Sequence, residues 1–458
     1  MPTSPRARGF TLLELLVGAA VGAVVLVGIS LTFISQAQQY QSHASRRAIQ
    51  ANARQSLGFL ERHLRVAGYG VDPDRAILAY DSYNAATDLQ DVGYPDAFVV
   101  HWRDPLFARR VVAATPAVLT LDQPLKQPMR LGQILLVICS PNPSPTSFAD
   151  LAINSTPPHA FITVGKYINA GTATINLDTT APSSAPNSPT RGPGRLFHEQ
   201  ATLGGAGDCF HNATYPPMVV LVHRAAFYVA MFDNDGNPAT PERTPYLMMH
   251  PGVDMPTATK LDGDGTIDAN DAVPVAEGIE QLQAAYILDT NDASANKTPM
   301  VLGVDTVMDA THYGENWEQK DPLLPTGWAF NPFTTYPTRL FPMQVAPFLT
   351  LPQAHLRDHL ANIRQVRVTL VARSTVPDPQ IPGDNLLTRF DGSPYPTGPT
   401  LADGTKAWRQ LENLTQGTIA AAFTPSGGHY YRTIVRQSVA PKNMLMNRQF
   451  VPVTPGGG

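Results

Sequence analysis

The sequence predicts an α+β protein in which one long N-terminal helix packs against an enlarged antiparallel β-sheet domain. Residues 10–35 form an apolar run with a single ionisable side chain, and an amphipathic helical pattern continues to about residue 67. Beyond residue 80 the chain changes to short apolar or alternating runs separated by turn residues. The 43 prolines and 34 glycines, which break helices, indicate strands and long loops there.

Composition and charge exclude several classes of function. The 33 basic and 37 acidic residues leave a formal net charge of -4, which gives no long-range attraction for nucleic acid. The sequence contains neither a phosphate-binding loop, nor the paired histidines of a zinc protease, nor a Gly-x-Ser-x-Gly elbow. We therefore expect no nucleic-acid partner and no catalytic residue.

The apolar run of residues 10–35 is longer than the roughly 20 apolar residues that cross a hydrocarbon core as a helix. Arg6 and Arg8 precede it, and no acidic residue lies before them. Because positively charged flanks stay on the cytoplasmic side, the short leader is expected in the cytoplasm and the rest of the chain outside it. The sequence predicts a single-pass membrane protein with an extracytoplasmic body.

The apolar run begins with the motif GFTLLEL at residues 9–15. This motif resembles the class III signal of type IV prepilins and type II secretion pseudopilins, in which a prepilin peptidase cuts after the glycine and methylates the new N-terminus. The resemblance implies that Gly9 is the last leader residue. Phe10 would then be the mature N-terminus and Glu14 the fifth mature residue.

Glu14 is the one acid in the apolar run. An ionised carboxylate deep in lipid costs at least about 2.5 to 3.5 kcal/mol, so we expect it where it meets a partner. The family resemblance implies that the partner is the free N-terminal amine of a neighbouring subunit, which sets the axial register of a filament. Glu14 is therefore predicted to be an assembly residue. The alternative is a carboxylate that reaches the membrane interface by itself.

The helical pattern continues past the apolar run, with charged residues on the other faces. The glycines at 68 and 70, followed by Pro73, predict its end, so a helix over residues 10–67 would be about 85 Å long. Its outer half needs a globular domain to pack against. The apolar positions that recur three or four residues apart are Ile49, Ala53, Leu57, Leu60 and Leu64.

These patterns divide the chain into four parts. A leader (residues 1–9) is followed by a helix that spans the membrane or forms a filament core (10–36) and by its amphipathic continuation (37–68). An extracytoplasmic β-rich domain with long Pro- and Gly-rich loops (80–452) completes the chain, as one unit or as two subdomains. No regular alternation of strands and helices follows residue 80, which favours an antiparallel sheet.

Short apolar segments of the body predict its strands. In residues 363–374, apolar side chains at even positions alternate with Arg367, Thr369 and Arg373, which predicts one buried and one solvent-exposed face. Residues 181–195, rich in Pro and Ser, predict an exposed loop. The predicted strands are 96–104, 110–122, 132–140, 159–167, 172–178, 218–233, 246–250, 282–289, 363–374 and 430–439.

Three segments of the body are similar in order and sequence to segments of the PilW family of minor pilins. They are VHRAAFYVAMFDNDGNP, VAEGIEQLQAAYILDTND and IRQVRVTLVARS. The segment LERHLRVAGYG at the helix end also fits this family, whereas residues 78–216 and 300–361 match nothing that we can name. The resemblance implies a type IV pilin-like fold and a minor pilin that waits in the bacterial inner membrane with its body in the periplasm.

The same resemblance implies partners and a final location. Such a protein would join other minor pilins and the major pilin in a priming or tip complex, carry a large tip adhesin of the PilY1 type, and end at the tip of an extracellular pilus. Prepilin peptidase and the inner-membrane assembly platform would act on it first. Two alternatives stay open: a minor pseudopilin of a type II secretion system, and a membrane-tethered calcium-dependent adhesin.

The segment KLDGDGTIDANDAV at residues 260–273 resembles an EF-hand-like or dockerin-like calcium loop with Gly265 at its sixth position. Lys260 stands at the first position, where such loops carry an acid. We expect Ca2+ here, with a solvated Asp-Gly turn as the alternative. Residues 233–242 carry a weaker copy of the pattern, and there a hairpin turn after the strand that ends at Phe232 is the ordinary interpretation. The predicted ligands are the side chains of Asp262, Asp264, Asp268 and Asp271 and the carbonyl of Thr266.

Cys139 and Cys209 are the only cysteines. If the body lies in an oxidising compartment, a disulfide between them is expected, and the chain-entropy relation gives it a stabilising effect of about 4 to 5 kcal/mol. The alternative is two buried thiols that pack as small apolar side chains.

Overall fold

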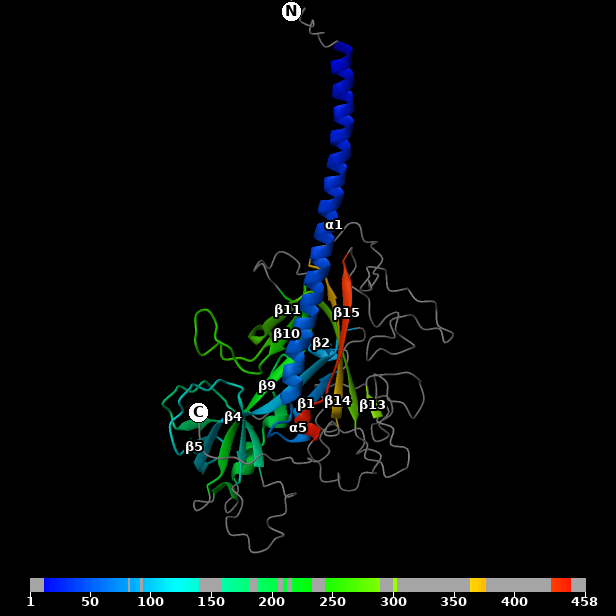
Figure 1. The fold of residues 1–458 in the computed structure, drawn as a ribbon. Helices are drawn as coiled ribbons and strands as arrows, with labels where there is room; N and C mark the ends of the chain where they lie inside the picture. Colours follow the sequence, from blue (N-terminus) through cyan, green and yellow to red (C-terminus); the bar gives the residue numbers. More distant parts are fainter. Residues whose placement is uncertain are drawn as a thin grey trace, which may run out of the picture.

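The structure is a computed structural model, and it describes residues 12–80, 83–90, 94–139, 159–180, 188–204, 209–211, 216–232, 244–288, 300–302, 363–375 and 430–445. One long helix rises from a β-rich body (Figure 1). The leader residues 1–9, Phe10 and the weaker acidic pattern at 233–242 lie outside the described residues.

The helices are α1 (Leu12–Val66), α2 (Pro73–Ala76) and α5 (Lys442–Leu445), with 3-10 turns η1 (Gly194–Phe197), η2 (Gln200–Gly204), η3 (Cys209–His211) and η4 (Ala269–Asp271). The strands are β1 (Ile77–Tyr80), β2 (Tyr83–Asn84), β3 (Leu89–Gln90), β4 (Ala97–Ala114), β5 (Val118–Leu121), β6 (Ile134–Ile138), β7 (His159–Thr163), β8 (Thr174–Asn176), β9 (Met218–Met231), β10 (Pro245–His250), β11 (Val273–Glu277), β12 (Ile279–Leu288), β13 (Met300–Leu302), β14 (Ile363–Arg373) and β15 (Arg432–Val439).

The lower half of α1 is packed against the body, as its amphipathic pattern predicts. Leu60 and Leu64 are fully buried, and the other residues of the predicted stripe are nearly so. They share one core with both sheets. The helix ends where Gly68 adopts a positive φ of 77°, a conformation that costs glycine little. The predicted helix and its buried stripe are confirmed.

The larger sheet is antiparallel throughout, as expected. Among the described residues it has nine strands, in the order β11-β10-β9-β4-β5-β8, with β1 on β4, β6 on β9 and β7 on β6. Its two long strands, β4 and β9, pair over most of their length. Side chains alternate between its faces, so that Val220 and Val222 join the core under α1 while Val219 and Leu221 join a second core on the other face.

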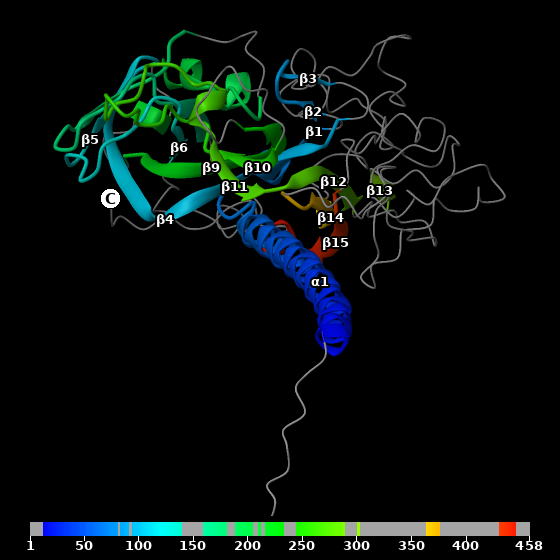
Figure 2. The ribbon, with the colours of Figure 1, turned by 90° about the horizontal axis from the view of Figure 1, so that it is seen from above.

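A smaller antiparallel sheet has the order β13-β12-β14-β15 and lies on the other side of the body from β5 and β6 (Figure 2). Helix α1 crosses β14 and β15 and also contacts β11 and β4. The chain passes from one sheet to the other at Gly278, whose φ is 76° and whose N–H donates to the carbonyl of Pro245. The α+β fold expected from the sequence is therefore what the structure has.

Two sequence predictions about exposure are wrong. In β14, Thr369 is fully buried. Arg373 is only 5% exposed, because its guanidinium lies 3.9 Å from the Glu280 carboxylate and stacks over the Tyr430 ring. The face predicted to be solvated is therefore covered at this end of the strand.

The second error concerns the loop predicted to be exposed at residues 181–195. Its described part includes buried Ser188 and Thr190, whose hydroxyl groups donate to the carboxylate of buried Asp88. The backbone carbonyl of Ser188 also accepts a hydrogen bond from buried Arg224. A polar cluster of distant residues therefore holds this segment inside the body, which its composition does not indicate.

The strand boundaries also differ from the prediction in places. The predicted strands 96–104 and 110–122 are joined by a single long strand, β4, which carries a register shift between Arg103 and Ala108. Only the last part of the second prediction forms a separate strand, β5. The strand β11, directly after the acidic segment, was not predicted, because its residues include Pro274 and lack a clear alternation.

Candidate functional site

The upper half of α1 is the most unusual surface of the described chain. Every side chain from Leu12 to Gln41 is exposed, including many large apolar residues. Figure 1 shows this half of α1 extending beyond the β-rich body. Leu12 is 81% exposed and Phe33 is 67% exposed. α1 is the one helix in the described part of the chain that is long and apolar enough to cross a membrane. Such a surface needs either lipid or other helices around it.

Glu14 lies in the first turn of the described helix, and its side chain is exposed. A carboxylate at this end is compatible with the helix dipole, whose positive end is at the N-terminus. Because residues four apart lie on one helix face, Glu14 shares its face with Gly18 and Gly22. Glu14 therefore lies at the N-terminal end of a helix face that contains the two glycines.

Small residues on this face leave room for a close neighbour. A Cβ atom added at Gly18, Gly22 or Gly28 would meet no atom within 4 Å. A shallow groove of about 360 Å³ on the same side is lined by Val25, Gly28, Ile29, Thr32, Phe33 and Gln36. The spacing of Gly18 and Gly22 is the G-x-x-x-G pattern through which membrane helices approach each other closely. The sequence analysis missed this pattern, although the spacing of the two glycines could have shown it.

Contacts from two distant strands and from α5 hold the lower half of the helix. The Asn52 amide donates to the carbonyl of Glu277 at 2.5 Å, and the Gln437 amide donates to the Glu61 carboxylate at 2.6 Å. The Asn443 amide donates to the carbonyl of Val66 at 3.2 Å, at the helix end, where carbonyl groups lack helical partners. The lower half of α1 is therefore fixed to the body, and the exposed half extends from it.

The family model for the prokaryotic N-terminal methylation motif matches residues 4–30, which include Glu14 and the first turns of α1. This chain has a prepilin-type N-terminus. The motif indicates a type IV pilin-like prepilin, anchored in the membrane through its N-terminal helix, that assembles with other pilins. No curated protein and no solved structure matches the chain.

In the β-rich body, the acidic segment forms a loop that its own carboxylates hold together. Asp271, 7% exposed, accepts hydrogen bonds from the backbone N–H groups of Met255 at 2.7 Å and of Asp268 at 2.9 Å. The Asp268 carboxylate accepts from the N–H of Asn270 at 2.8 Å and thereby caps η4. Burial raises the pKa of Asp271, which disfavours the ionised form that a cation would need.

The remaining predicted calcium ligands do not gather around one point. Asp264 accepts from the hydroxyl of Thr266 at 2.6 Å, and Asp262 is exposed. Within the part of the chain that the structure describes, no three His, Cys, Asp or Glu side chains are placed to share a metal ion. In this arrangement the carboxylates of Asp264, Asp268 and Asp271 accept hydrogen bonds from N–H and O–H groups, and calcium binding stays a prediction.

The two cysteines meet in the second core of the β-rich body. Cys139, directly after β6, and Cys209, at the start of η3, form a disulfide with their Cα atoms 5.6 Å apart. Cys139 is 2% exposed. The bond connects the strand that pairs with β9 to a 3-10 turn 70 residues later in the sequence.

Proposed function

We propose that this protein is a minor pilin of a type IV pilus. Prepilin peptidase would cut it after Gly9, and the assembly platform of the inner membrane would then incorporate it into a priming or tip complex with other minor pilins above the major pilin. The complex would carry a tip adhesin. The observation that supports this proposal most is the fully exposed apolar half of α1, which has Glu14 in its first turn.

The exposed apolar half explains why the protein needs two environments in turn. Burial of apolar surface is worth about 25 cal/mol per Å², so an unprotected helix of this kind would aggregate in water. Before assembly, lipid covers it. After extraction, the apolar faces of neighbouring helices take the place of the lipid, and the carboxylate of Glu14 pairs with the free N-terminal amine of a neighbouring pilin subunit.

The body supports a position at the tip instead of repeated use along the shaft. A domain that contains both a nine-stranded and a four-stranded sheet is bulky beside a single helix. A domain of this size is difficult to repeat when helices pack closely in a filament core. One copy at the end meets no such limit.

The test is to replace Glu14 in the native bacterium and to follow the protein by immunoblot in membranes and in sheared pili. Glu14→Ala should leave membrane insertion and the new Phe10 N-terminus intact and remove the protein from pili. Gln41→Ala, an exposed polar residue of the same helix half that does not line the groove, is the matched control and should be incorporated normally.

Deletion of the gene distinguishes the alternatives. A minor pilin predicts few or no pili and normal protein secretion. Loss of secretion with normal piliation would instead identify a pseudopilin of a type II secretion system. Normal incorporation of the Glu14→Ala protein would contradict the assembly role and favour a membrane-tethered adhesin.

A further inference from the structure

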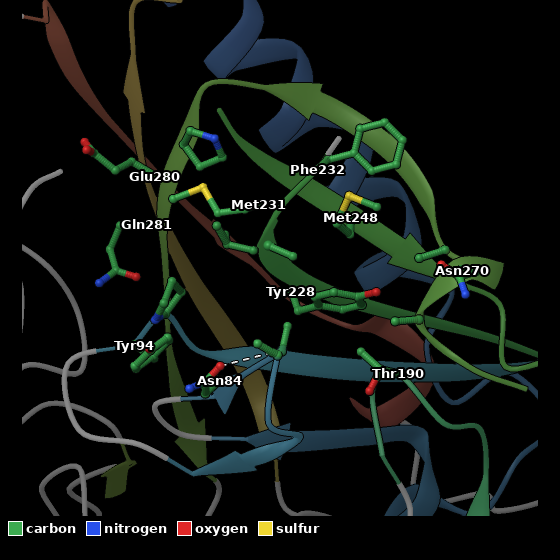
Figure 3. Close-up of a pocket in the computed structure, with 18 residues that line it drawn as sticks. Asn84, Tyr94, Thr190, Tyr228, Met231, Phe232, Met248, Asn270, Glu280 and Gln281 are labelled. Carbon is green, nitrogen blue, oxygen red and sulfur yellow. Dashed lines mark hydrogen bonds between the residues drawn. The ribbon is translucent and has the colours of Figure 1, made fainter. Parts of the chain in front are cut away.

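A pocket of about 710 Å³ lies between the two sheets, away from the exposed half of α1 (Figure 3). This volume is within the range of ligand-binding pockets in proteins. The ends of β9 and β10 form one wall, and the start of β12 with Tyr94 forms another. Figure 3 shows Glu280, Gln281 and Tyr94 on one side, Asn270 and Thr190 on the other, and Tyr228 between them.

The pocket lies beside a stretch of β9 that has a strand partner on one side only. Pairing between β4 and β9 ends at Phe98 opposite Phe227. Before that point the chain turns away, since the N–H of Asp96 donates to the carbonyl of Leu282 in β12 at 2.8 Å. Residues 228–231, the last four of β9, therefore pair with β10 on one side. On the other side, where β4 pairs with the earlier part of β9, no strand among the described residues pairs with them.

The direction of the backbone groups follows from the register. The N–H of Phe232 donates to the carbonyl of Thr244, which precedes β10. Because successive residues of a strand point their N–H and C=O groups to opposite sides, Ala230 also points toward β10. Val229 and Met231 therefore point their backbone groups toward the side of the pocket. Such an edge can accept an added strand.

The lining of the pocket is apolar with a few neutral polar groups. Tyr228, Met231, Phe232 and Met248 are large apolar side chains of the lining, and methionine adapts its shape readily to different partners. Asn84, Asn270 and Gln281 provide amides.

The one carboxylate of the lining is already neutralised. Glu280 bonds to Arg432 at 2.7 Å and lies 3.9 Å from Arg373, and its side chain is 6% exposed. Because this charge is balanced inside the body, the pocket suits a neutral apolar group and gives no reason to select a cation.

We propose that this site binds an extended peptide segment of a partner protein as an added β-strand. The backbone of the segment would pair with the edge at Val229 and Met231, and an uncharged apolar side chain of the segment would enter the pocket beside Tyr228. This mode differs from helix packing, because it uses the body of the protein. It therefore goes beyond the proposed function and does not depend on Glu14.

The test is a selection of random short peptides displayed on phage against the full-length protein in detergent, followed by measurement of the affinities of the selected peptides. Met231→Pro removes the N–H that points toward the pocket but leaves the ladder to β10 intact, because that N–H is not part of it. Ala86→Trp, at an exposed turn residue of the lining, fills the pocket without altering the edge. Val112→Ala, at an exposed apolar residue of β4, is the control.

The proposal expects selected peptides that alternate apolar and polar residues. Each of the two site variants should weaken their binding about tenfold or more, and the control should leave it unchanged. Copies of the peptides methylated at backbone nitrogens should fail to compete. Thermal unfolding of each variant shows whether it is folded. If Met231→Pro does not fold, Ala86→Trp still decides the test.

Three outcomes would overturn the proposal. The first is a selection that yields no binding peptide. The second is binding that both folded variants retain. The third is undiminished competition by the methylated copies, which would show that the pocket takes a side chain or small apolar molecule without strand pairing.

Discussion

The carboxylate of Asp254 accepts a hydrogen bond from the backbone N–H of Gly265 at 2.9 Å. Its other oxygen accepts from the N–H of Asp264 at 3.1 Å, and Asp254 itself is 2% exposed. The residue that organises the acidic loop thus lies outside the calcium-like register of residues 260–271.

Asp254→Asn should destabilise the body by about 2 kcal/mol. An asparagine amide can accept only one of the two bonds and would oppose the other N–H with its own, and bonds to charged groups are worth about 1.5 to 3 kcal/mol. Unfolding of the full-length protein by denaturant in detergent measures the change. Asp262→Asn, at an exposed residue of the same loop, should leave the unfolding midpoint where it was.

We expect millimolar calcium to leave the thermal unfolding midpoint of the protein unchanged. The carboxylates of Asp268 and Asp271 already accept hydrogen bonds from N–H groups, which hold the loop in its fold without a bound ion. Magnesium serves as the control. A calcium-specific rise in the midpoint that Asp264→Asn removes would contradict this expectation and restore the calcium site predicted from the sequence.

Replacing Cys139 and Cys209 together by serine should lower the free energy of unfolding by about 4 kcal/mol according to the chain-entropy relation. The bond joins residues 70 apart in sequence, so its loss returns much freedom to the unfolded chain. Comparison of the variant with the wild type, each with and without reductant, measures the effect. Reductant should destabilise only the wild type, and equal unfolding curves for all samples would contradict the prediction.

The stability of the body should fall as the pH decreases from about 6.5 to about 4, in part because of His250. Burial, and next the charge of Arg224, lower its pKa to about 4. Its Nδ1 accepts from the N–H of Gly252 at 2.9 Å while Nε2 lies 2.7 Å from the carbonyl of Asp268, so the folded state holds the neutral ring. In this pH window the unfolded chain binds a proton that the folded one does not, which favours unfolding.

His250→Gln should therefore reduce the slope of unfolding free energy against pH between these limits. The linkage relation gives a difference of about 3 kcal/mol across the window. His43→Gln, at an exposed residue of α1, is the matched control and should keep the slope of the wild type. An identical slope in the His250 variant would show that this ring does not carry the effect.

Leu60→Ala should destabilise the body by about 2 to 5 kcal/mol, since Leu60 is fully buried in the core shared by α1 and both sheets. Leu26→Ala removes the same atoms from a residue that is 66% exposed on the same helix. This control should leave the unfolding of the body unchanged. Equal effects of the two substitutions would contradict the division of α1 into a seated and an exposed half.

Several features could be predicted because they depend on local periodicity. The stripe that contains Leu57 and Leu64 follows the period of 3.6 residues of a helix, so its burial was visible in the sequence. Runs such as β6 and β9 were recognisable as strands for a similar reason, since apolar β-branched residues favour buried strands.

The pairing of the strands was not predictable in this way. β12 pairs with β14, and β9 pairs with β4 and β6, so that these partners come from distant parts of the chain, whereas β9 and β10 are consecutive strands. The same holds for buried Ser188, which lies in a segment, residues 181–195, whose Pro and Ser content predicted a loop exposed to solvent. It is buried because Asp88, 100 residues earlier, is present to accept its hydroxyl. Such pairings depend on long-range geometry and not on local pattern.

The sequence by itself determined that a long helix begins this protein, that its first half is apolar around one acid, and that its second half must pack on a β-rich body. These properties are local, because each depends on residues within a few turns. Only the tertiary structure decided that Asp254 organises the acidic loop, that Cys139 meets Cys209, and that β9 keeps an open edge beside a pocket. Those relations require distant segments to meet, and the free energy of packing decides which segments do.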